Sequence, residues 1–290
     1  MKIAHFEGPD GAPGVGIVEA PRLWPLVGFD SLLALIAAGD GDPGTAAARA
    51  ERGAALDLDE VELRAPLDPQ VRDYFCVGLN YLAHVEEGRE FRGAAIPDET
   101  PKYPTYFTKA TLTANGPHAP VPLHESTTRR LDFEAELAVV IGRRGRDIDP
   151  RLALEHVAGY TCANDISARE LQRRHGGQWV KGKSLDGTCP TGPWLVTRDE
   201  IPDPQTLDLS CRLNGQQMQH ANTSRMIFPV AQLIADLSAG MTLIPGDVIL
   251  TGTPEGVGFA RKPPVYLADA DVLETEISGI GTMRNVIRAG

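Results

Sequence analysis

The chain has 290 residues with a hydrophobic content of 42%, enough for one large domain or for a large and a small one. Its 39 Asp and Glu residues outnumber its 28 Lys and Arg residues, and the net charge of -11 argues against nucleic acid or an anionic membrane as the main partner. Four cysteines without a C-x-x-C pair, no amino-terminal signal segment and no apolar run of about 20 residues predict a reduced, cytoplasmic protein.

Residues 1–68 are predicted to form a small amino-terminal α/β domain, and residues 69–290 a larger one. The pattern of residues 14–20 predicts a strand, and residues 31–38 and 45–55 have helical patterns. This part carries no recognisable chemistry. Asp68-Pro69 marks the expected boundary.

A histidine and a glutamate follow the first predicted strand of the larger domain, residues 74–79. Residues 80–87 favour one or two helical turns, in which His84 and Glu87 can touch. A carboxylate that orients an imidazole makes a general base, although such pairs are also common on helix surfaces. Residues 88–104 are rich in Gly, Pro and charge, which predicts a mobile lid. Lys109 ends the next strand and either faces solvent or lines the site.

Alternating carboxylates occupy residues 131–142, which have the pattern of one continuous strand. Asp132, Glu134 and Glu136 would then point the same way. The strand ends in an apolar run, and buried unpaired anions are too costly to persist without a cation. Oxygen ligands suit Mg²⁺, Mn²⁺ or Ca²⁺. The alternative is a strand whose acidic face is turned to water.

A further acidic residue, Asp165, follows a predicted buried strand at residues 158–163. Residues 166–175 have a helical pattern, so Asp165 is expected to cap that helix, a role that needs no catalysis. Arg169 and Gln172 are three apart on the helix and can face the same side as Asp165.

Residues 177–184 match the phosphate-binding pattern G-x-x-x-x-G-K-[ST]. That motif requires a strand before it and a helix after it. Here a predicted helix precedes the motif, and Pro190, Gly192 and Pro193 follow it. We therefore disfavour a nucleotide site and expect Lys183 to point into a pocket as a single cation.

The rest of the chain is predicted to contain strands, one helix and a glycine-rich loop. Asn214-Gly215 indicates a hairpin, residues 226–237 an amphipathic helix, and residues 271–287 a strand, turn and strand. The loop 252–258 follows a buried strand at residues 248–251. Its backbone N–H groups can approach an anion closely, although the loop can equally be a tight turn.

Five motifs together resemble the fumarylacetoacetate hydrolase family. They are Gly78-Leu79-Asn80-Tyr81-x-x-His84-x-x-Glu87, Phe133-Glu134-Ala135-Glu136-Leu137, Asn164-Asp165-Ile166-Ser167-Ala168-Arg169, Gly182-Lys183-Ser184-Leu185-Asp186 and Thr251-Gly252-Thr253-Pro254-x-Gly256-Val257-Gly258. The resemblance implies an α+β, mainly β fold, a mixed β-roll that is usually dimeric, and one Mg²⁺ or Mn²⁺ held by three carboxylates.

The resemblance also assigns roles to residues of this chain. The metal ligands would be Glu134, Glu136 and Asp165. The activating dyad would be His84 and Glu87, with Lys183 beside the substrate oxyanion, and the substrate contacts would be Arg169, Gln172, Thr253, Gly252 and Asn80. Asn80 stands where the eponymous hydrolases carry an acidic ligand, which favours the branch of acylpyruvate hydrolases, decarboxylases and isomerases that includes enzymes of aromatic catabolism.

These residues predict chemistry on a 2-oxo acid with a second carbonyl group. Such an acid can chelate the ion, which stabilises the enolate released when the distal C–C bond breaks. His84 would activate water and Lys183 would stabilise the oxyanion. The expected activity is hydrolysis of an acylpyruvate. Oxaloacetate decarboxylation and isomerisation of 2-hydroxyhepta-2,4-diene-1,7-dioate are alternatives at the same site.

Two hypotheses from other classes stay open. A P-loop NTPase would bind ATP with Mg²⁺. A non-catalytic 2-oxo-acid binding protein would keep the metal but need no base, so a His84–Glu87 dyad argues against it.

Overall fold

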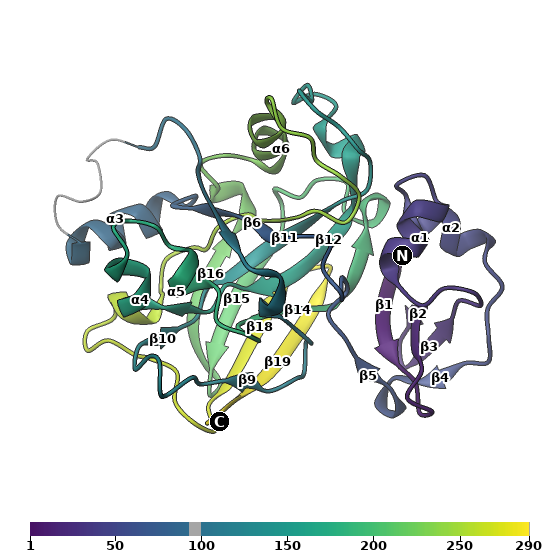
Figure 1. Cartoon of the computed structure of the whole chain (residues 1–290), viewed down its shortest axis with the longest axis horizontal. Helices are drawn as coiled ribbons and strands as arrows, with labels where there is room; N and C mark the ends of the chain where they lie inside the picture. Colours follow the sequence, from purple (N-terminus) through teal and green to yellow (C-terminus); the bar gives the residue numbers. More distant parts are fainter. Residues whose placement is uncertain (93–99, 290) are drawn as a thin grey trace.

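The structure is a computed structural model that describes residues 1–92 and 100–289, and the backbone alone for residues 90–92. Sheets dominate it, and short helices lie around them (Figure 1). Most strand pairs are antiparallel, but β17 with β6, β14 with β8 and β19 with β9 are parallel. The predicted α+β, mainly β fold with mixed sheets is therefore confirmed.

The largest sheet has twelve strands. In spatial order its main path is β4 (Leu56–Asp57), β3 (Arg22–Pro25), β2 (Pro13–Glu19), β1 (Lys2–Glu7), β14 (Cys189–Thr197), β12 (Val157–Asn164), β11 (Ala135–Ile141), β17 (Val248–Leu250), β6 (Tyr74–Gly78) and β7 (Thr105–Lys109). Off this path, β5 (Glu62–Leu63) pairs with β1, and β8 (Ala114–Asn115) pairs with β14.

The described part of the chain also contains two smaller sheets, six α-helices and several short 3₁₀-helices. The five-stranded sheet is ordered β16 (Gln216–Asn222), β15 (Asp208–Leu213), β18 (Val272–Ile277), β19 (Gly281–Arg288) and β9 (Val121–Pro122). The two-stranded sheet joins β10 (Leu131–Asp132) and β13 (Ser167–Ala168). The α-helices are α1 (Leu32–Ala38), α2 (Pro43–Arg49), α3 (Leu82–Arg92), α4 (Arg169–Arg174), α5 (Val180–Lys183) and α6 (Val230–Ser238).

The amino-terminal strands and helices α1 and α2 gather at one end of the molecule (Figure 1). Strand β1 pairs with β14, so β1 to β4 extend the large sheet. The division into residues 1–68 and 69–290 stays a prediction. The helix predicted at residues 45–55 is shorter and begins earlier, because Asp42 Oδ1 accepts a hydrogen bond of 3.0 Å from Gly44 N and Pro43 opens the first turn.

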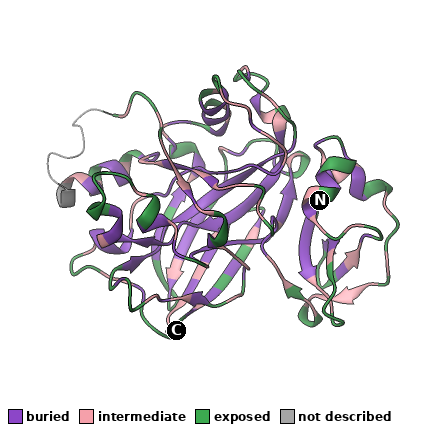
Figure 2. Cartoon of the chain, viewed as in Figure 1, coloured by how far each residue is buried: buried purple, intermediate pink, exposed green. Residues whose placement is uncertain are grey.

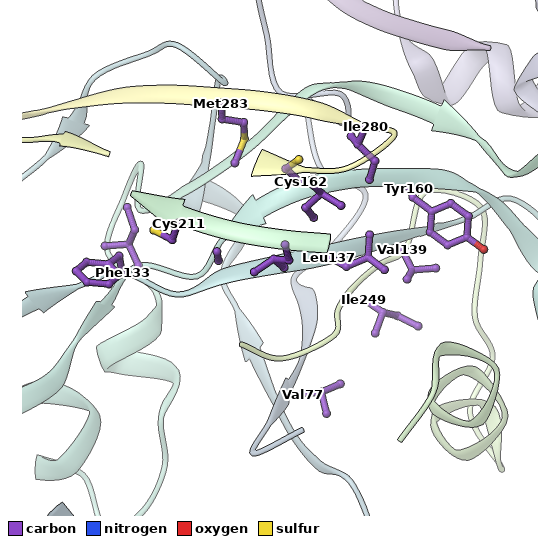
Figure 3. Close-up of a cluster of buried hydrophobic side chains, with 14 of the residues drawn as sticks. Val77, Phe133, Leu137, Val139, Tyr160, Cys162, Cys211, Ile249, Ile280 and Met283 are labelled. Atoms are coloured by element: carbon purple, nitrogen blue, oxygen red, sulfur yellow. The ribbon is translucent and has the colours of Figure 1, made fainter. Parts of the chain in front are cut away.

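The centre of the large sheet is fully buried, and β11 lies between β12 and β17 (Figure 2). Its side chains alternate between two cores. Leu137 and Val139 belong to a core that also contains residues of the five-stranded sheet such as Met283 (Figure 3). Ala138 and Val140 face the second core, with α1. Glu134 and Glu136 continue the face of Ala138, as the alternation of a strand requires.

Three predicted elements are corrected. The strand expected over residues 131–142 is broken after Asp132, because Leu131 and Asp132 pair with β13 instead of continuing β11. The helix expected at residues 166–175 begins only at Arg169, so Asp165 does not cap it. The helix expected at residues 226–237 begins at Val230, after Pro229.

Two further predictions from the sequence concern membrane-spanning segments and the lid. Among the described residues, no helix is both long and apolar enough to cross a bilayer. The lid predicted at residues 88–104 falls partly outside the described residues, because residues 93–99 are not described; α3 continues through residues 88–92.

Candidate active site

Three carboxylates meet beneath a cleft at the start of β11. Glu134 directly precedes this strand, Glu136 is its second residue, and Asp165 directly follows the neighbouring strand β12. Ligand oxygens of the three residues lie within 4.8 Å of one another. All three side chains are buried, so the alternative of an acidic face turned to water is wrong.

Two buried lysines neutralise part of this cluster. Lys183 Nζ lies 2.6 Å from Glu134 Oε2 and 2.7 Å from Asp165 Oδ2. Lys109 Nζ lies 2.8 Å from Asp165 Oδ1 and donates a 3.0 Å hydrogen bond to the carbonyl of Ile166. Lys109 is fully buried and pairs with Asp165, so it belongs to the site instead of facing solvent, although it does not line the cleft. These contacts, and not a helix cap, hold Asp165.

The charge states of the two glutamates differ. Burial alone would raise the pKa of Glu134, but Lys183 and Arg169 hold it well below its usual range. For Glu136, burial and repulsion from Asp165 and Glu134 raise the pKa well above the ordinary value. Within the described part of the chain Glu136 has no ion-pair partner, and its Oε2 accepts a 2.7 Å hydrogen bond from Gly252 N. Glu136 therefore needs a proton or a cation.

The cluster fits a divalent ion. Its buried ionisable side chains are four carboxylates, with Asp132 as the fourth, and three cations, the two lysines and Arg169. With all four carboxylates ionised, the charge of the cluster is minus one. A divalent ion would change this to plus one and supply the positive charge that Glu136 lacks. Carboxylate oxygens are also the ligands preferred by Mg²⁺, Mn²⁺ and Ca²⁺.

The predicted dyad is present at the same cleft. His84 Nδ1 lies 3.3 Å from Glu87 Oε2, and Glu87 Oε1 accepts a 3.0 Å hydrogen bond from Gly256 N. His84 is 4% exposed and lines the cleft together with Glu134 and Glu136. The helix α3 thus brings the imidazole to the carboxylates, and the pair is not a surface contact.

This arrangement agrees with comparisons to known proteins. The family model "Fumarylacetoacetate (FAA) hydrolase C-terminal" matches residues 73–288. The chain belongs to this family. Oxaloacetate tautomerase YisK of Bacillus subtilis is 45% identical over 231 residues, which are 79% of this chain and 74% of that protein.

Solved structures of other proteins agree over the whole chain. Fumarylacetoacetate hydrolase from Exiguobacterium antarcticum has a TM-score of 0.85 at 40% identity, with 100% of both chains covered. Maleylpyruvate hydrolase from a Sphingobium species has a TM-score of 0.79 at 30% identity, also with 100% of both chains covered. The chain is therefore an enzyme of the fumarylacetoacetate hydrolase family.

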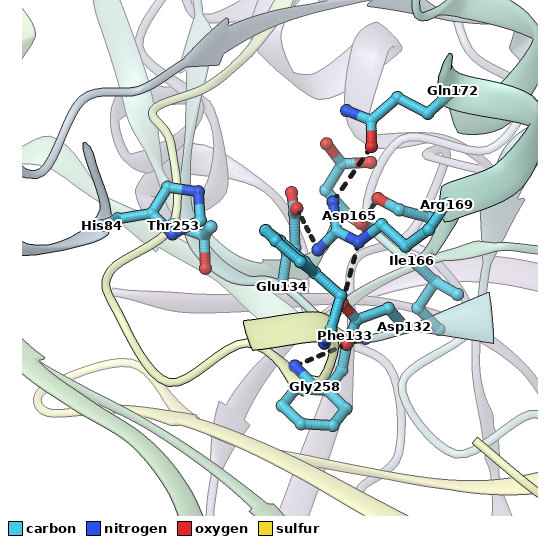
Figure 4. A network of polar contacts seen from close by, with 12 residues as sticks. His84, Asp132, Phe133, Glu134, Asp165, Ile166, Arg169, Gln172, Thr253 and Gly258 are labelled. Carbon is cyan, nitrogen blue, oxygen red and sulfur yellow. Dashed lines mark hydrogen bonds and ion pairs between the residues drawn. The ribbon is translucent and has the colours of Figure 1, made fainter. Parts of the chain in front are cut away.

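Arg169 is buried among protein groups. Its Nη2 lies 2.6 Å from Glu134 Oε1, its Nε 2.8 Å from Asp132 Oδ2, and its Nη1 donates a 3.1 Å hydrogen bond to Gln172 Oε1 (Figure 4). The guanidinium also lies 4.5 Å from the ring centre of Phe259. Each of the three guanidinium nitrogens of Arg169 thus contacts a protein group. The predicted contact of Arg169 with substrate would need its remaining N–H groups.

Among the other predicted substrate contacts, Gln172 and Thr253 line the cleft, whereas Asn80 and Gly252 do not. Asn80 is fully buried, and its amide bonds the backbone of Phe228 and the carbonyl of Thr251. Gly252 has a φ of 97°, and an added Cβ would lie 2.8 Å from Asn80 Cβ, so only glycine fits there. Thr253 lines the cleft, and its Oγ1 accepts a 2.8 Å hydrogen bond from Gln219 Nε2.

The cleft has one apolar wall. Phe107 and Trp179 meet edge to face with ring centres 5.2 Å apart, and Lys183 Nζ lies 5.0 Å from the ring centre of Phe107. The cleft is narrow, with a cavity volume of about 20 Å³. Its lining residues are Val77, Gly78, Leu79, His84, Phe107, Glu134, Glu136, Gln172, Trp179, Lys183 and Thr253.

Two residues of the site carry no sequence signal for their role. Trp179 lies inside the apparent phosphate-binding motif and lines the cleft. In the structure this motif forms the short helix α5, which follows α4 and precedes β14. It therefore lacks the preceding strand and the following helix that a phosphate-binding loop requires. Gln219 lies on β16 and bonds the backbone N–H of Ala135 as well as Thr253. The burial of Gln219, which marks it as part of the site, is visible only in the structure.

Proposed function

We propose that the chain is a divalent-metal-dependent enzyme that transfers a proton at the carbon beside the keto group of a short 2-oxo acid, with oxaloacetate as the first substrate to test. The observation that carries this proposal is the common cleft of the dyad His84–Glu87 and the carboxylates Glu134, Glu136 and Asp165. Mg²⁺ or Mn²⁺ is the proposed ion, and Ca²⁺ has the same ligand preference.

The ion would be held by Glu134, Glu136 and Asp165. When bound, it would act as a Lewis acid on the oxygens of the 2-oxo acid and make the neighbouring C–H group more acidic. The excess of one positive charge, counted over the buried side chains and the ion, would also favour an anionic substrate despite the acidic net charge of the whole chain.

His84 would exchange the proton. Because Glu87 accepts at Nδ1, the imidazole carries a proton there and leaves Nε2 free to take the proton from carbon. The same imidazolium can return the proton to the substrate oxygen, which converts keto to enol without a co-reactant. An ammonium has three donors, and the one of Lys183 that is not directed to Glu134 or Asp165 can serve a substrate oxygen.

One observation favours oxaloacetate among the 2-oxo acids. The relative of Bacillus subtilis, 45% identical over most of this chain, is an oxaloacetate tautomerase.

Hydrolysis of an acylpyruvate is the second candidate. It is supported by the similarity to maleylpyruvate hydrolase and by the dyad, which can activate water as well as take a proton from carbon. In that reaction His84 would take a proton from water, and the oxygen would attack the distal carbonyl. The C–C bond would then break with its electron pair left on the 2-oxo acid as an enolate, which would take the proton back from His84.

One assay separates the candidates. Enol oxaloacetate, oxaloacetate, a 2-oxo-diene acid and several acylpyruvates would be supplied with Mn²⁺, with Mg²⁺ or with EDTA, while loss of the enol absorbance and release of pyruvate are followed. We expect metal-dependent interconversion of enol and keto oxaloacetate. Cleavage of acylpyruvates without effect on the tautomers would favour hydrolysis, and activity that resists EDTA would contradict the metal site.

We also propose that the chain forms a homodimer, as its resemblance to the family implies. Light scattering of the same preparation tests this.

A further inference from the structure

Asp132 stands at the centre of a buried network beside the proposed metal ligands. Its Oδ1 accepts hydrogen bonds of 2.9 Å from Phe133 N and 2.7 Å from Gly258 N. Its Oδ2 accepts from Phe259 N at 3.0 Å and from Arg169 Nε at 2.8 Å (Figure 4). A carboxylate offers about four acceptor positions, and four N–H donors fill them, so Asp132 is not free to bind a metal ion.

On one side this network reaches a proposed metal ligand. Arg169 joins Asp132 to Glu134, because its Nε contacts the first carboxylate and its Nη2 the second. The guanidinium is rigid and planar, so the two contacts fix the orientation of the Glu134 carboxylate relative to Asp132.

On the other side the network reaches the dyad. Gly258 lies two residues after Gly256, whose N–H group holds Glu87 against His84. The contact is close, since an added Cβ at Gly258 would lie 2.5 Å from Asp132 Oδ1 and 2.0 Å from the carbonyl oxygen of Val265. Asp132 therefore fixes the position of the loop directly after Gly256, the residue that contacts the dyad.

We infer that Asp132 is a positioning residue that couples the dyad to the metal-binding carboxylates. Through Gly258 and Phe259 it places the loop that holds Glu87, and through Arg169 it orients Glu134. No role of this kind follows from the alternating pattern of the sequence, in which Asp132 only resembles a third acid of the same strand.

Asp132→Asn removes the charge and half of the acceptor capacity while it keeps the shape of the side chain. The freed guanidinium of Arg169 should then bind Glu134 more fully, so that the dissociation constant for Mn²⁺ rises about tenfold or more, the usual cost of losing a residue that supports a metal ligand. Amide hydrogen exchange of residues 256–259 should become faster, since two of their N–H groups lose carboxylate acceptors.

Asp247→Asn is the matched control. Asp247 is also a buried carboxylate that binds an arginine and a backbone amide, with Arg72 Nε at 2.6 Å and Ile244 N at 2.8 Å. It precedes β17, whereas Gly252 follows the other end of this strand. This variant should lose stability but keep both Mn²⁺ affinity and the exchange rates of residues 256–259.

If Asp132→Asn does not fold, Arg169→Lys is the second variant to test. It keeps the bonds between Asp132 and the loop but cannot span both carboxylates, so Mn²⁺ binding should weaken while exchange of residues 256–259 stays as in the wild type. Should Asp132→Asn fold, bind Mn²⁺ within about twofold of the wild type and leave the exchange rates unchanged, the inference is wrong. Failure of the wild type to bind Mn²⁺ would refute the metal site of the proposed function, and the exchange rates would still decide the coupling to the loop.

Discussion

The two sides of the cleft are held in different ways. On the carboxylate side, Glu134, Glu136 and Asp165 lie at or next to the ends of two buried central strands, and the ion pairs of Glu134 and Asp165 are between 2.6 and 2.8 Å long. On the dyad side, His84 has one 3.3 Å contact to Glu87, on a helix at the edge of the fold. The carboxylates are thus preorganised by the core, whereas the dyad depends on a helix and a loop.

Loss of a carboxylate should have the largest effect. Glu136→Ala is expected to abolish stoichiometric Mn²⁺ binding and to lower the proposed activity by roughly 10³-fold or more, because a Lewis acid contributes several kcal/mol. Isothermal titration and steady-state assays check this. Glu274→Ala on β18 removes a glutamate outside the site and should change neither quantity. A fully active, Mn²⁺-bound Glu136→Ala protein would disprove the ligand assignment.

Loss of Lys109 should show that the carboxylate side depends on buried charge compensation. Lys109→Met removes one of the two cations of Asp165, and breaking a buried pair typically lowers the free energy of unfolding by about 3–5 kcal/mol. Urea unfolding in EDTA measures this. Added Mn²⁺ should recover part of the loss. A change below about 1 kcal/mol, the range of a surface ion pair, would contradict the role of Lys109.

Substitution of the dyad should affect turnover without affecting the ion. His84→Ala should bind Mn²⁺ normally but lose about 10²-fold or more in kcat, the range for a general base. Glu87→Gln should have a weaker effect, since the imidazole stays but loses the carboxylate that orients it. The measurements are kcat at saturating Mn²⁺ and the Mn²⁺ affinity. Wild-type turnover of His84→Ala would make the pair a structural contact.

The smallest effect should appear only without metal and depend on pH. The pKa of Glu136 is raised in the folded protein, so its stabilising contribution is present at acidic pH, below the usual pKa of a glutamate, and is lost as pH rises toward the folded value. In EDTA, Glu136→Gln should therefore lose less stability than the wild type between mildly acidic and alkaline pH. Unfolding curves at several pH values measure this. Parallel pH profiles of the two proteins would contradict the charge assignment.

The sequence alone determined the features that depend on local geometry. Glu134 and Glu136 share a face because a strand repeats every two residues, and His84 meets Glu87 because a helix brings residues three apart together. The five motifs in their order likewise determined the family and the mainly β fold.

Tertiary structure alone decided the partners of these groups. Asp132 leaves the predicted strand to bind Arg169 and Gly258, and Asp165 binds Lys109 instead of capping a helix. The strand pattern predicted that Asp132 and Glu134 share one face of the same strand. In the structure Asp132 belongs to β10, which pairs with β13, and its carboxylate binds Arg169. Such choices depend on which distant segments the sheet brings together, and a buried charge must find its counter-charge among those segments, wherever they lie in the sequence.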